Sequence, residues 1–328
     1  MIYISNFNIH IKSGKCSKCD NTIVIHRRHS GQFLCPSCFE KSIEKIIYKT
    51  ISKYKMLDPQ DKIIVGLSGG KDSTALLYNL IKIQEKSHNS EPLIAVTIDE
   101  GIKDYRDNAI KKAQAFCKKN NVEHHIISFK EKFGLSLDEI IVQKKDTSNY
   151  KYACNYCATI RRRLLNDSAK VLGGNVLAMG HNLTDLSETF LMNILYKRLN
   201  LIGSQYIFKQ ESELIRKYFI KKILPLMRIP EEEIFLYANI KKFEYYPSHC
   251  PYREKDPIIR KRVLDFIQEC KKFSPEIEFN LLNGFLELSE ILYNHYDKKR
   301  YHSCKQCGSL SSGTDLCTYC SLKKELKL

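Results

Sequence analysis

The sequence predicts an α/β protein in which a Rossmann-like parallel sheet, with helices on both faces, is flanked by a zinc ribbon at each end. Apolar runs rich in β-branched residues alternate with segments of helical periodicity over the middle of the chain. Paired C-x-x-C motifs lie near both ends, in segments too short to build a core of their own. These two patterns together give the predicted architecture.

The 328-residue chain is long enough for one sizeable core with small appendages. We assign residues 1–45 to an N-terminal zinc ribbon, 46–270 to a nucleotide-binding and catalytic domain, 271–300 to a helical connector and 301–328 to a C-terminal zinc ribbon.

Each ribbon offers four thiolates at a spacing that closes a tetrahedron around Zn²⁺ and leaves no coordination position open. The expected ligands are Cys16, Cys19, Cys35 and Cys38 at the first site and Cys304, Cys307, Cys317 and Cys320 at the second. Such sites are structural. Between the first ligand pairs, His26, Arg27, Arg28 and His29 suit an RNA phosphate backbone, although a solvated hairpin tip is an equally good interpretation.

In the middle of the chain, strands are expected at residues 62–67, 92–98, 124–129 and 175–179, and helices at about 73–86, 105–120, 157–171 and 183–198. Ligands of open parallel sheets bind at the carboxyl ends of the strands. The residues that directly follow these strands are therefore the candidate site.

The loop SGGKDS follows the first strand. It is not a Walker loop, because Val65 stands where that pattern needs glycine and Asp72 where it needs a hydroxyl residue. Its glycines let backbone N–H groups approach an anion, and the following helix adds the positive end of its dipole. Asp72 can hold Mg²⁺. The candidate phosphate-binding residues are Ser68, Gly69, Gly70, Lys71, Asp72 and Ser73.

Two other strand ends carry candidate residues. Gly66 and Ile98 close the first two strands, where the main chain could contact adenine. The segment GHNLTDLSET follows the strand at 175–179, and its Gly180 and Asp185 lie beside the expected phosphate site. Asp185 could face Mg²⁺ and the phosphates, or it could serve only the dipole of its own helix.

A third group of cysteines is different. On a helix, Cys154, Cys157 and Arg161 share one face, and Cys250 in YPSHCPY is the remaining clustered thiol. Three thiolates could hold a [4Fe–4S] cluster that keeps one iron open for an exogenous ligand such as sulfide. Zinc with His249 as a fourth ligand is an alternative, and so is a metal-free persulfide and disulfide pair.

The chain is basic, with 53 Lys and Arg against 37 Asp and Glu and a formal charge of +16. This balance favours a phosphate-rich partner such as nucleic acid, unless it reflects only a lysine-rich solvated surface. No apolar run reaches the length of a membrane span, and the first residues lack the pattern of a signal peptide. We expect a cytoplasmic protein without a membrane partner.

The order of ribbon, SGGKDS, C-x-x-C, GHN-x-x-D, CPY and second ribbon resembles the tRNA 2-thiouridine synthetases typified by TtuA and NcsA. These belong to the TtcA/TtuA family of PP-loop ATP pyrophosphatases. The resemblance implies an adenine nucleotide α-hydrolase-like domain that binds ATP, a [4Fe–4S] cluster on Cys154, Cys157 and Cys250, and a tRNA uridine as substrate. It also implies a homodimer. Relatives of the cytidine-thiolating TtcA type lack the paired ribbons.

Two positions depart from the family pattern. Thr184 replaces the first aspartate of GHNLDD, so only Asp185 carries over, and Ala158 replaces a common glycine. Arg161 occupies a position that is basic in relatives, where it would neutralise phosphate or developing charge.

The expected reaction is adenylation of uridine O2 by ATP, followed by displacement of AMP by sulfur to give 2-thiouridine. Arg161, Asp185 and the three thiols would be the catalytic groups. The sulfur donor is free sulfide or a ubiquitin-like thiocarboxylate carrier, and the target uridine is at the wobble position or in the T-loop. The alternatives are a PP-loop ligase or amidase, a persulfide-based thiolase without a cluster, and a non-enzymatic RNA-binding adaptor.

Overall fold

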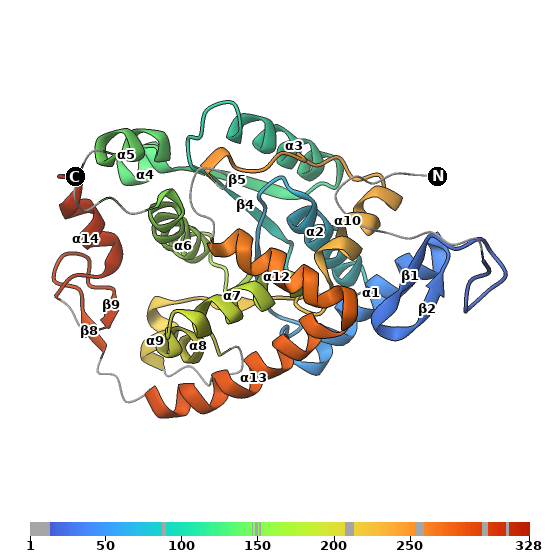
Figure 1. Cartoon of the computed structure of the whole chain (residues 1–328). Coiled ribbons are helices and arrows are strands. Elements are labelled where there is room, and N and C mark those ends of the chain that lie inside the picture. Colours follow the sequence, from blue (N-terminus) through green and yellow to red (C-terminus); the bar gives the residue numbers. More distant parts are fainter. Residues whose placement is uncertain are drawn as a thin grey trace.

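The computed structural model describes residues 14–86, 90–145, 147, 150, 152–206, 213–252, 259–296, 301–312 and 315–328. A five-stranded sheet lies at the centre of the molecule, and all of its neighbouring strands run parallel (Figure 1). In spatial order the strands are β5 (Glu123–Ser128), β4 (Ile94–Asp99), β3 (Ile63–Gly66), β6 (Val176–Ala178) and β7 (Lys221–Ile223). The predicted fold class is confirmed, and so are the four predicted strands.

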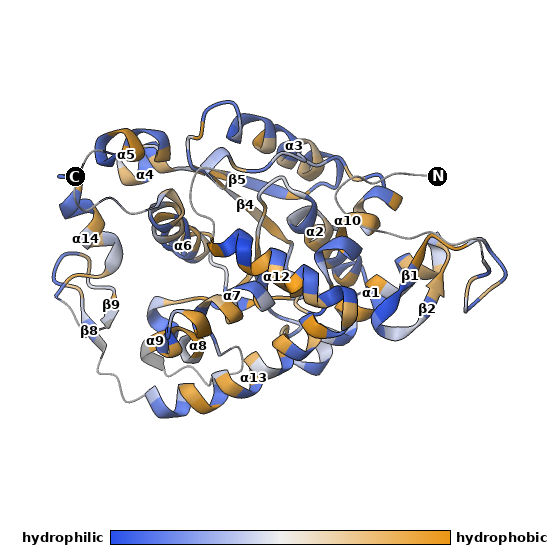
Figure 2. Cartoon of the chain, in the orientation of Figure 1, coloured by the Kyte–Doolittle hydropathy of each residue, from blue (hydrophilic) through white to orange (hydrophobic). Residues whose placement is uncertain are grey.

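The sequence did not predict β7. This strand is only three residues long and lies at an edge of the sheet, where Lys221 and Lys222 are exposed and only Ile223 is buried. An edge strand buries too little to produce a recognisable apolar run. By contrast, five of the six residues of the interior strand β4 are buried, which explains its continuous apolar sequence. Figure 2 shows this difference in hydropathy between the interior β4 and the other edge strand, β5.

Successive side chains of a strand point to opposite faces of the sheet, so the two faces have separate cores. Val65 packs in one apolar cluster with α1 (Pro36–Lys53), α2 (Lys71–Gln84), α3 (Arg106–Lys119) and α10 (Glu231–Ile240). Its neighbour Ile64 packs in the other cluster with α4 (Phe129–Phe133), α5 (Leu137–Lys144) and α6 (Ala153–Val171). Helix α6 begins at Ala153 rather than at 157.

The other helices are α7 (Leu183–Leu195), α8 (Leu199–Ser204), α9 (Glu213–Tyr218), α12 (Ile259–Phe273), α13 (Ile277–Tyr296) and α14 (Thr318–Glu325). Helices α12 and α13 pack on α7, and α13 also packs on α8. None of the described helices is both long and apolar enough to cross a lipid bilayer.

The family departure at Thr184 has a structural reason in the packing of α13 on α7. The Thr184 hydroxyl is buried and donates to Glu278 Oε1 at 2.7 Å, and it accepts the backbone N–H of Glu231 at 3.1 Å. A carboxylate at position 184 would face the buried Glu278 carboxylate instead.

The N-terminal ribbon contains the hairpin β1 (Ile25–Arg27) and β2 (Gln32–Leu34), and it runs directly into α1. Arg27 is 5% exposed and makes two bonds to Glu233 of α10, from Nε at 3.0 Å and from Nη2 at 2.7 Å. The expectation that Arg27 could bind RNA phosphate is therefore wrong. The sequence could not show this, because the partner carboxylate lies more than 200 residues away in the chain.

The C-terminal ribbon contains the hairpin β8 (Tyr301–Ser303) and β9 (Leu310–Ser312), followed by α14. Leu322 and Leu326 join the apolar cluster of α6. Arg163 of α6 also donates to two ribbon sulfurs, Cys307 Sγ at 3.5 Å and Cys317 Sγ at 4.0 Å. The C-terminal ribbon is thus packed against the helix that carries Cys154 and Cys157.

Candidate active site

The two predicted four-cysteine sites are present at the two ends of the chain. Within each set, all four sulfurs lie within 4.8 Å of one another. The separation is 3.6 Å between Cys19 and Cys35 and 3.7 Å between Cys307 and Cys317. Sulfurs bound tetrahedrally to Zn²⁺ at about 2.3 Å would be about 3.8 Å apart, so both sets fit this ion.

A cleft of about 3360 Å³ includes the carboxyl ends of the strands and extends past the sheet to residues before β3 and β6 and to the N-terminal ribbon. It is lined by the SGGKDS loop and by residues of α6, α7, β7, α10 and α12. Small-molecule sites usually measure about 300–1,000 Å³, so this cleft has room for a nucleotide together with part of a larger substrate.

The backbone of the SGGKDS loop requires glycine at its second position. Gly69 has φ +84°, and a Cβ there would lie 2.1 Å from the carbonyl oxygen of Ala109. The Ser68 and Ser73 hydroxyls are 3.0 Å apart, and Ser68 N–H donates to Ser73 Oγ at 3.1 Å. Gly70 is the N-cap of α2 and has no side chain to satisfy the first helical N–H groups. The loop therefore presents donors suited to a phosphate.

The Lys71 ammonium lies between two carboxylates, 3.0 Å from Asp72 Oδ2 and 2.7 Å from Glu231 Oε1. Burial alone would lower the pKa of Lys71, but these two carboxylates outweigh it and raise the pKa above its usual range. Lys71 is therefore a permanent cation. No local pattern in the sequence indicates that Glu231, from α10, reaches the loop.

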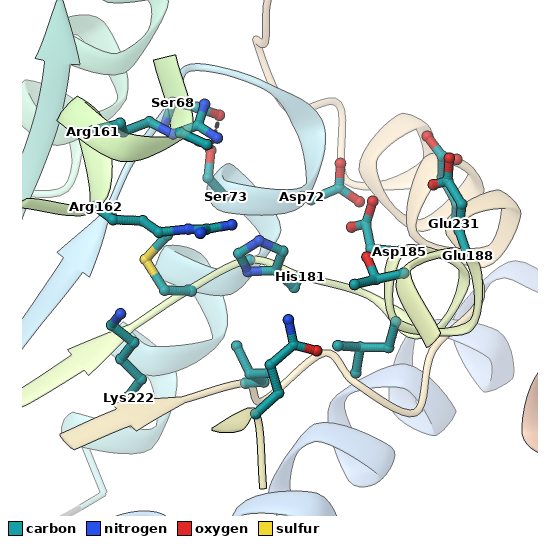
Figure 3. Close-up of a pocket in the computed structure, with 18 of the residues that line it drawn as sticks. Ser68, Asp72, Ser73, Arg161, Arg162, His181, Asp185, Glu188, Lys222 and Glu231 are labelled. Carbon is teal, nitrogen blue, oxygen red and sulfur yellow. Dashed lines mark hydrogen bonds between the residues drawn. The ribbon is translucent and has the colours of Figure 1, made fainter. Parts of the chain in front are cut away.

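Asp72 and Asp185 lie close together at the start of their two helices (Figure 3). Asp72 Oδ1 accepts from Asn182 Nδ2 at 3.1 Å, and Asp185 Oδ2 accepts the Asn182 backbone N–H at 3.2 Å. Asp185 thus caps α7, while its Oδ1 lies 3.9 Å from Arg260. Burial raises the pKa of both carboxyl groups, and the charge of Asp185 raises that of Asp72 further. A divalent cation would relieve this repulsion.

Close backbone packing joins the GHN turn to the phosphate loop. A Cβ on Gly180 would lie 3.1 Å from the backbone nitrogen of Ser73, and one on Gly66 would lie 2.8 Å from the sulfur of Met179. The glycine of the GHN turn therefore allows the end of β6 to lie directly against the start of α2.

Arg106 is a buried residue of this site that sequence reasoning missed. Its guanidinium donates to the carbonyl oxygen of Ile98 at 2.7 Å and to that of Ser68 at 2.8 Å, and its Nε lies 2.7 Å from Glu100 Oε2. Arg106 thus fixes the end of β4 to the phosphate loop. Ile98 and Gly66 line the cleft, but the Ile98 carbonyl is already used by Arg106.

Cys154, Cys157 and Cys250 line the same cleft. They differ from the ribbon sets, because among the described residues only the two ribbons form groups of three or more ligand atoms that lie within 4.8 Å of one another. His249 belongs to no such group in that part of the chain. The alternative of a zinc ion held by the three cysteines and His249 therefore finds no support.

Burial raises the pKa of Cys157 to about 12, against the opposing charge of Arg161. Metal binding deprotonates coordinating thiols, and the resulting anions would lie beside the Arg161 cation. The three soft donors therefore fit a metal group bulkier than one ion. The Arg161 guanidinium also lies 3.7 Å from Glu100 Oε1.

Cationic side chains line the cleft. Among them are Arg161 and Arg162 of α6, Lys222 of β7, and Arg260 of α12, which lies 3.9 Å from Asp185 and 2.8 Å from Glu188. Within the described part of the chain, Arg162 makes no ion pair, and both burial and the charges of Arg161 and Arg260 lower its pKa. The cleft therefore suits a polyanionic ligand.

Comparisons with known proteins agree with this geometry. Residues 38–265 match the PP-loop domain family, and residues 15–40 match the N-terminal LIM domain of the 2-thiouridine synthetase TtuA.

Two curated relatives cover 95% of this chain. A probable sulfurtransferase of Methanocaldococcus jannaschii is 36% identical over 88% of its own length, and the tRNA 2-thiolation protein NcsA of Haloferax volcanii is 30% identical over 99%. The solved U34-tRNA thiolase NcsA of Methanococcus maripaludis, with its [4Fe–4S] cluster, is 34% identical. It matches 95% of this chain and 96% of its own with a TM-score of 0.79.

Proposed function

The chain belongs to the PP-loop family of tRNA 2-thiolation proteins, and on that premise we propose that it replaces O2 of a tRNA uridine by sulfur in an ATP-dependent reaction. One observation carries this proposal. A phosphate loop, a carboxylate pair and three thiols from separate segments of the chain line one cleft. A PP-loop ligase would need the first two features but not the thiols.

In this proposal the SGGKDS loop binds the triphosphate of ATP. The free N–H groups at the start of α2 and the Lys71 cation hold phosphate oxygens, and Asp72 and Asp185 hold Mg²⁺. The main chain at Gly66, Ile98 and Gly180 lies close to the bound nucleotide and shapes its pocket. Lys71 must exchange part of its contact with Glu231 for phosphate, which links ATP binding to α10.

The first chemical step forms a bond between uridine O2 and the α-phosphorus and releases pyrophosphate. Negative charge grows on the α-phosphate oxygens, and Arg161 can stabilise it from the first turns of α6. Sulfide then adds at C2, and AMP leaves with the original oxygen.

We propose that Cys154, Cys157 and Cys250 hold the [4Fe–4S] cluster. With three protein ligands, such a cluster supplies one iron whose open position can bind sulfide. The protein contributes the three thiolates and the neighbouring Arg161 cation, which offsets their charge.

The partners in this proposal are tRNA and a sulfur donor, either free sulfide or a ubiquitin-like thiocarboxylate carrier. We also propose a cytoplasmic homodimer with two structural zinc ions. An RNA substrate is supported by the cations that line the cleft, Arg161, Arg162, Lys222 and Arg260.

The test uses the full chain, reconstituted anaerobically with iron and sulfide and then incubated with unmodified tRNA and Mg-ATP. Nuclease fragments are weighed by mass spectrometry. We expect one fragment to gain the mass of an oxygen-to-sulfur exchange, only with ATP present, and that fragment identifies the uridine. The incubation is done once with free sulfide and once with a ubiquitin-like thiocarboxylate carrier as sulfur donor. ATP cleavage without sulfur gain from either of these donors would contradict the proposal and favour the ligase.

A further inference from the structure

His181 lies in the GHN turn, between the end of β6 and the start of α7. Figure 3 shows its ring in the cleft, between the Arg162 guanidinium and the carboxylates of Asp72 and Asp185. Within the described part of the chain its imidazole makes no hydrogen bond or ion pair, although it is exposed to the cleft. The proposed phosphate and metal contacts leave this imidazole without a role.

The backbone beside His181 fixes its position against the phosphate loop. The preceding Gly180 packs so closely on the first turn of α2 that a Cβ would lie 3.1 Å from Ser73 N and 3.2 Å from the carbonyl carbon of Asp72. The backbone of His181 therefore lies beside the loop that binds the triphosphate in the proposed function. Its ring lies on the side of the Arg162 guanidinium (Figure 3).

The proposed reaction requires a proton acceptor. A uridine whose O2 attacks phosphorus must lose its N3 proton, because the adenylated base has a double bond between N3 and C2. The other acidic groups nearby already have partners: Asp72 and Glu231 contact Lys71, Asp185 caps α7, and Glu188 bonds Arg260 at 2.8 Å.

We propose that His181 is the catalytic base that takes the N3 proton of the target uridine. In the first step the N3–H bond breaks toward the imidazole, the O2–phosphorus bond forms, and pyrophosphate leaves with its bonding electrons. In the second step hydrosulfide adds to C2 and N3 regains the proton from the imidazolium. AMP then leaves with the C2–O electrons, and the proton on sulfur goes to water. This inference rests on the proposed thiolation.

The charges around His181 make its basicity depend on the nucleotide. Desolvation by the surrounding walls of the cleft, and then the cations Arg161, Arg260, Arg162 and Lys222, lower the pKa of His181 to about 4. The facing carboxylates, Asp72 and Asp185, do not compensate for them. Bound ATP adds negative charge beside these cations and so raises the pKa of His181 toward its ordinary value of about 6.5. The imidazole becomes an effective base only when ATP is present.

The first test measures this pKa in the wild-type protein. Protein labelled with ¹³C at histidine Cε1 is titrated by NMR, and the His181 resonance is identified by its absence in His181→Gln. We expect a pKa near 4 in the free protein and an increase of at least about one pH unit with Mg²⁺ and a non-hydrolysable ATP analogue. An ordinary pKa in the free protein, or no change with the analogue, would overturn the dependence of this basicity on the nucleotide.

The second test measures single-turnover thiolation with His181→Gln. We expect a loss on the order of 100-fold in the rate, with unchanged binding of ATP and tRNA. A tRNA carrying 5-fluorouridine at the target has a more acidic N3–H, and the defect should be several-fold smaller on it. An equal defect on both tRNAs would assign His181 a merely structural role.

His125→Gln is the matched control, because His125 lies on the edge strand β5 and its imidazole contacts Glu123 Oε1 at 2.7 Å. It should leave rate and pH profile unchanged. If wild-type protein does not thiolate tRNA at all, the proposed function fails. If wild type and His181→Gln thiolate equally well, only the base assignment fails.

Discussion

The two ribbons and the cleft use cysteine in opposite ways. Ribbon sulfurs are drawn together within 4.8 Å, and backbone N–H groups bond to them, as Cys317 N does to Cys304 Sγ at 3.3 Å. The cleft thiols form no such close group among the described residues, Cys154 is exposed, and the charges of Arg161 and Glu100 act on Cys157. Closed coordination stabilises a fold, whereas three thiols in an open, cationic cleft leave a position for chemistry.

The largest expected effect separates these two uses of cysteine. Cys250→Ala should lower thiolation by more than about a hundredfold, since even supporting residues of a metal site contribute up to that much. Zinc content, measured by elemental analysis, should not change. The matched control is Cys270→Ala, because Cys270 lies on α12 and does not line the cleft. Full activity in Cys250→Ala would remove the cluster from the proposal.

The second prediction concerns the attachment of the N-terminal ribbon. Glu233→Ala leaves the Arg27 guanidinium buried without its carboxylate, which should cost about 3–5 kcal/mol of unfolding free energy. Urea unfolding measures this loss. The exposed pair of Lys272 with Glu269 is the comparison, and Glu269→Ala should cost less than about 1 kcal/mol. Similar costs for the two variants would show that the buried pair does not hold the ribbon.

The third prediction concerns the attachment of the C-terminal ribbon to α6. Arg163→Met removes the guanidinium that donates to Cys307 and Cys317, so zinc at this site should be held about 10–100-fold more weakly. Zinc release to a chromophoric chelator gives the measurement, with the N-terminal site as internal reference. Equal release from both sites would show that Arg163 does not support the metal.

A smaller effect is expected at Thr184. Thr184→Val leaves the buried Glu278 oxygen without its hydroxyl donor, for a cost of about 1–3 kcal/mol in unfolding free energy. Thr184→Ser keeps the hydroxyl and should retain most of the stability. If valine is tolerated as well as serine, packing rather than the hydrogen bond decides this position.

The smallest effect concerns pH. Burial raises the pKa of Asp72, so the folded protein binds this proton more tightly than the unfolded chain. Its contribution to stability is therefore most favourable below the unfolded pKa of about 4 and declines as pH rises through the raised folded value. Asp72→Asn should remove this decline, a change of less than about 1 kcal/mol, and should also remove the stabilisation that Mg²⁺ would give at the proposed Asp72 and Asp185 site. Urea unfolding between pH 4 and 7, with and without Mg²⁺, measures both effects. An Asp72→Asn variant that keeps the wild-type decline or the wild-type response to Mg²⁺ would contradict the prediction.

The sequence alone determined the local features of this protein. Apolar runs and helical periodicity predicted four of the five central strands, because interior strands must be buried on both faces. The C-x-x-C spacings predicted both four-cysteine sites, because each knuckle sets its sulfurs locally. The glycines of SGGKDS predicted that backbone N–H groups can approach an anion there, and this stays a prediction. The structure adds that Gly69 has a positive φ and no room for a Cβ.

Which distant charges meet depends on how the folded chain packs. It paired Arg27 with Glu233 and Lys71 with Glu231, and it buried Arg106 between the end of β4 and the phosphate loop. It also placed four cations from α6, β7 and α12 near enough to His181 to lower its pKa. No local pattern encodes these contacts, because a charged residue looks the same in sequence whether its partner is solvent or a carboxylate brought from elsewhere by the fold.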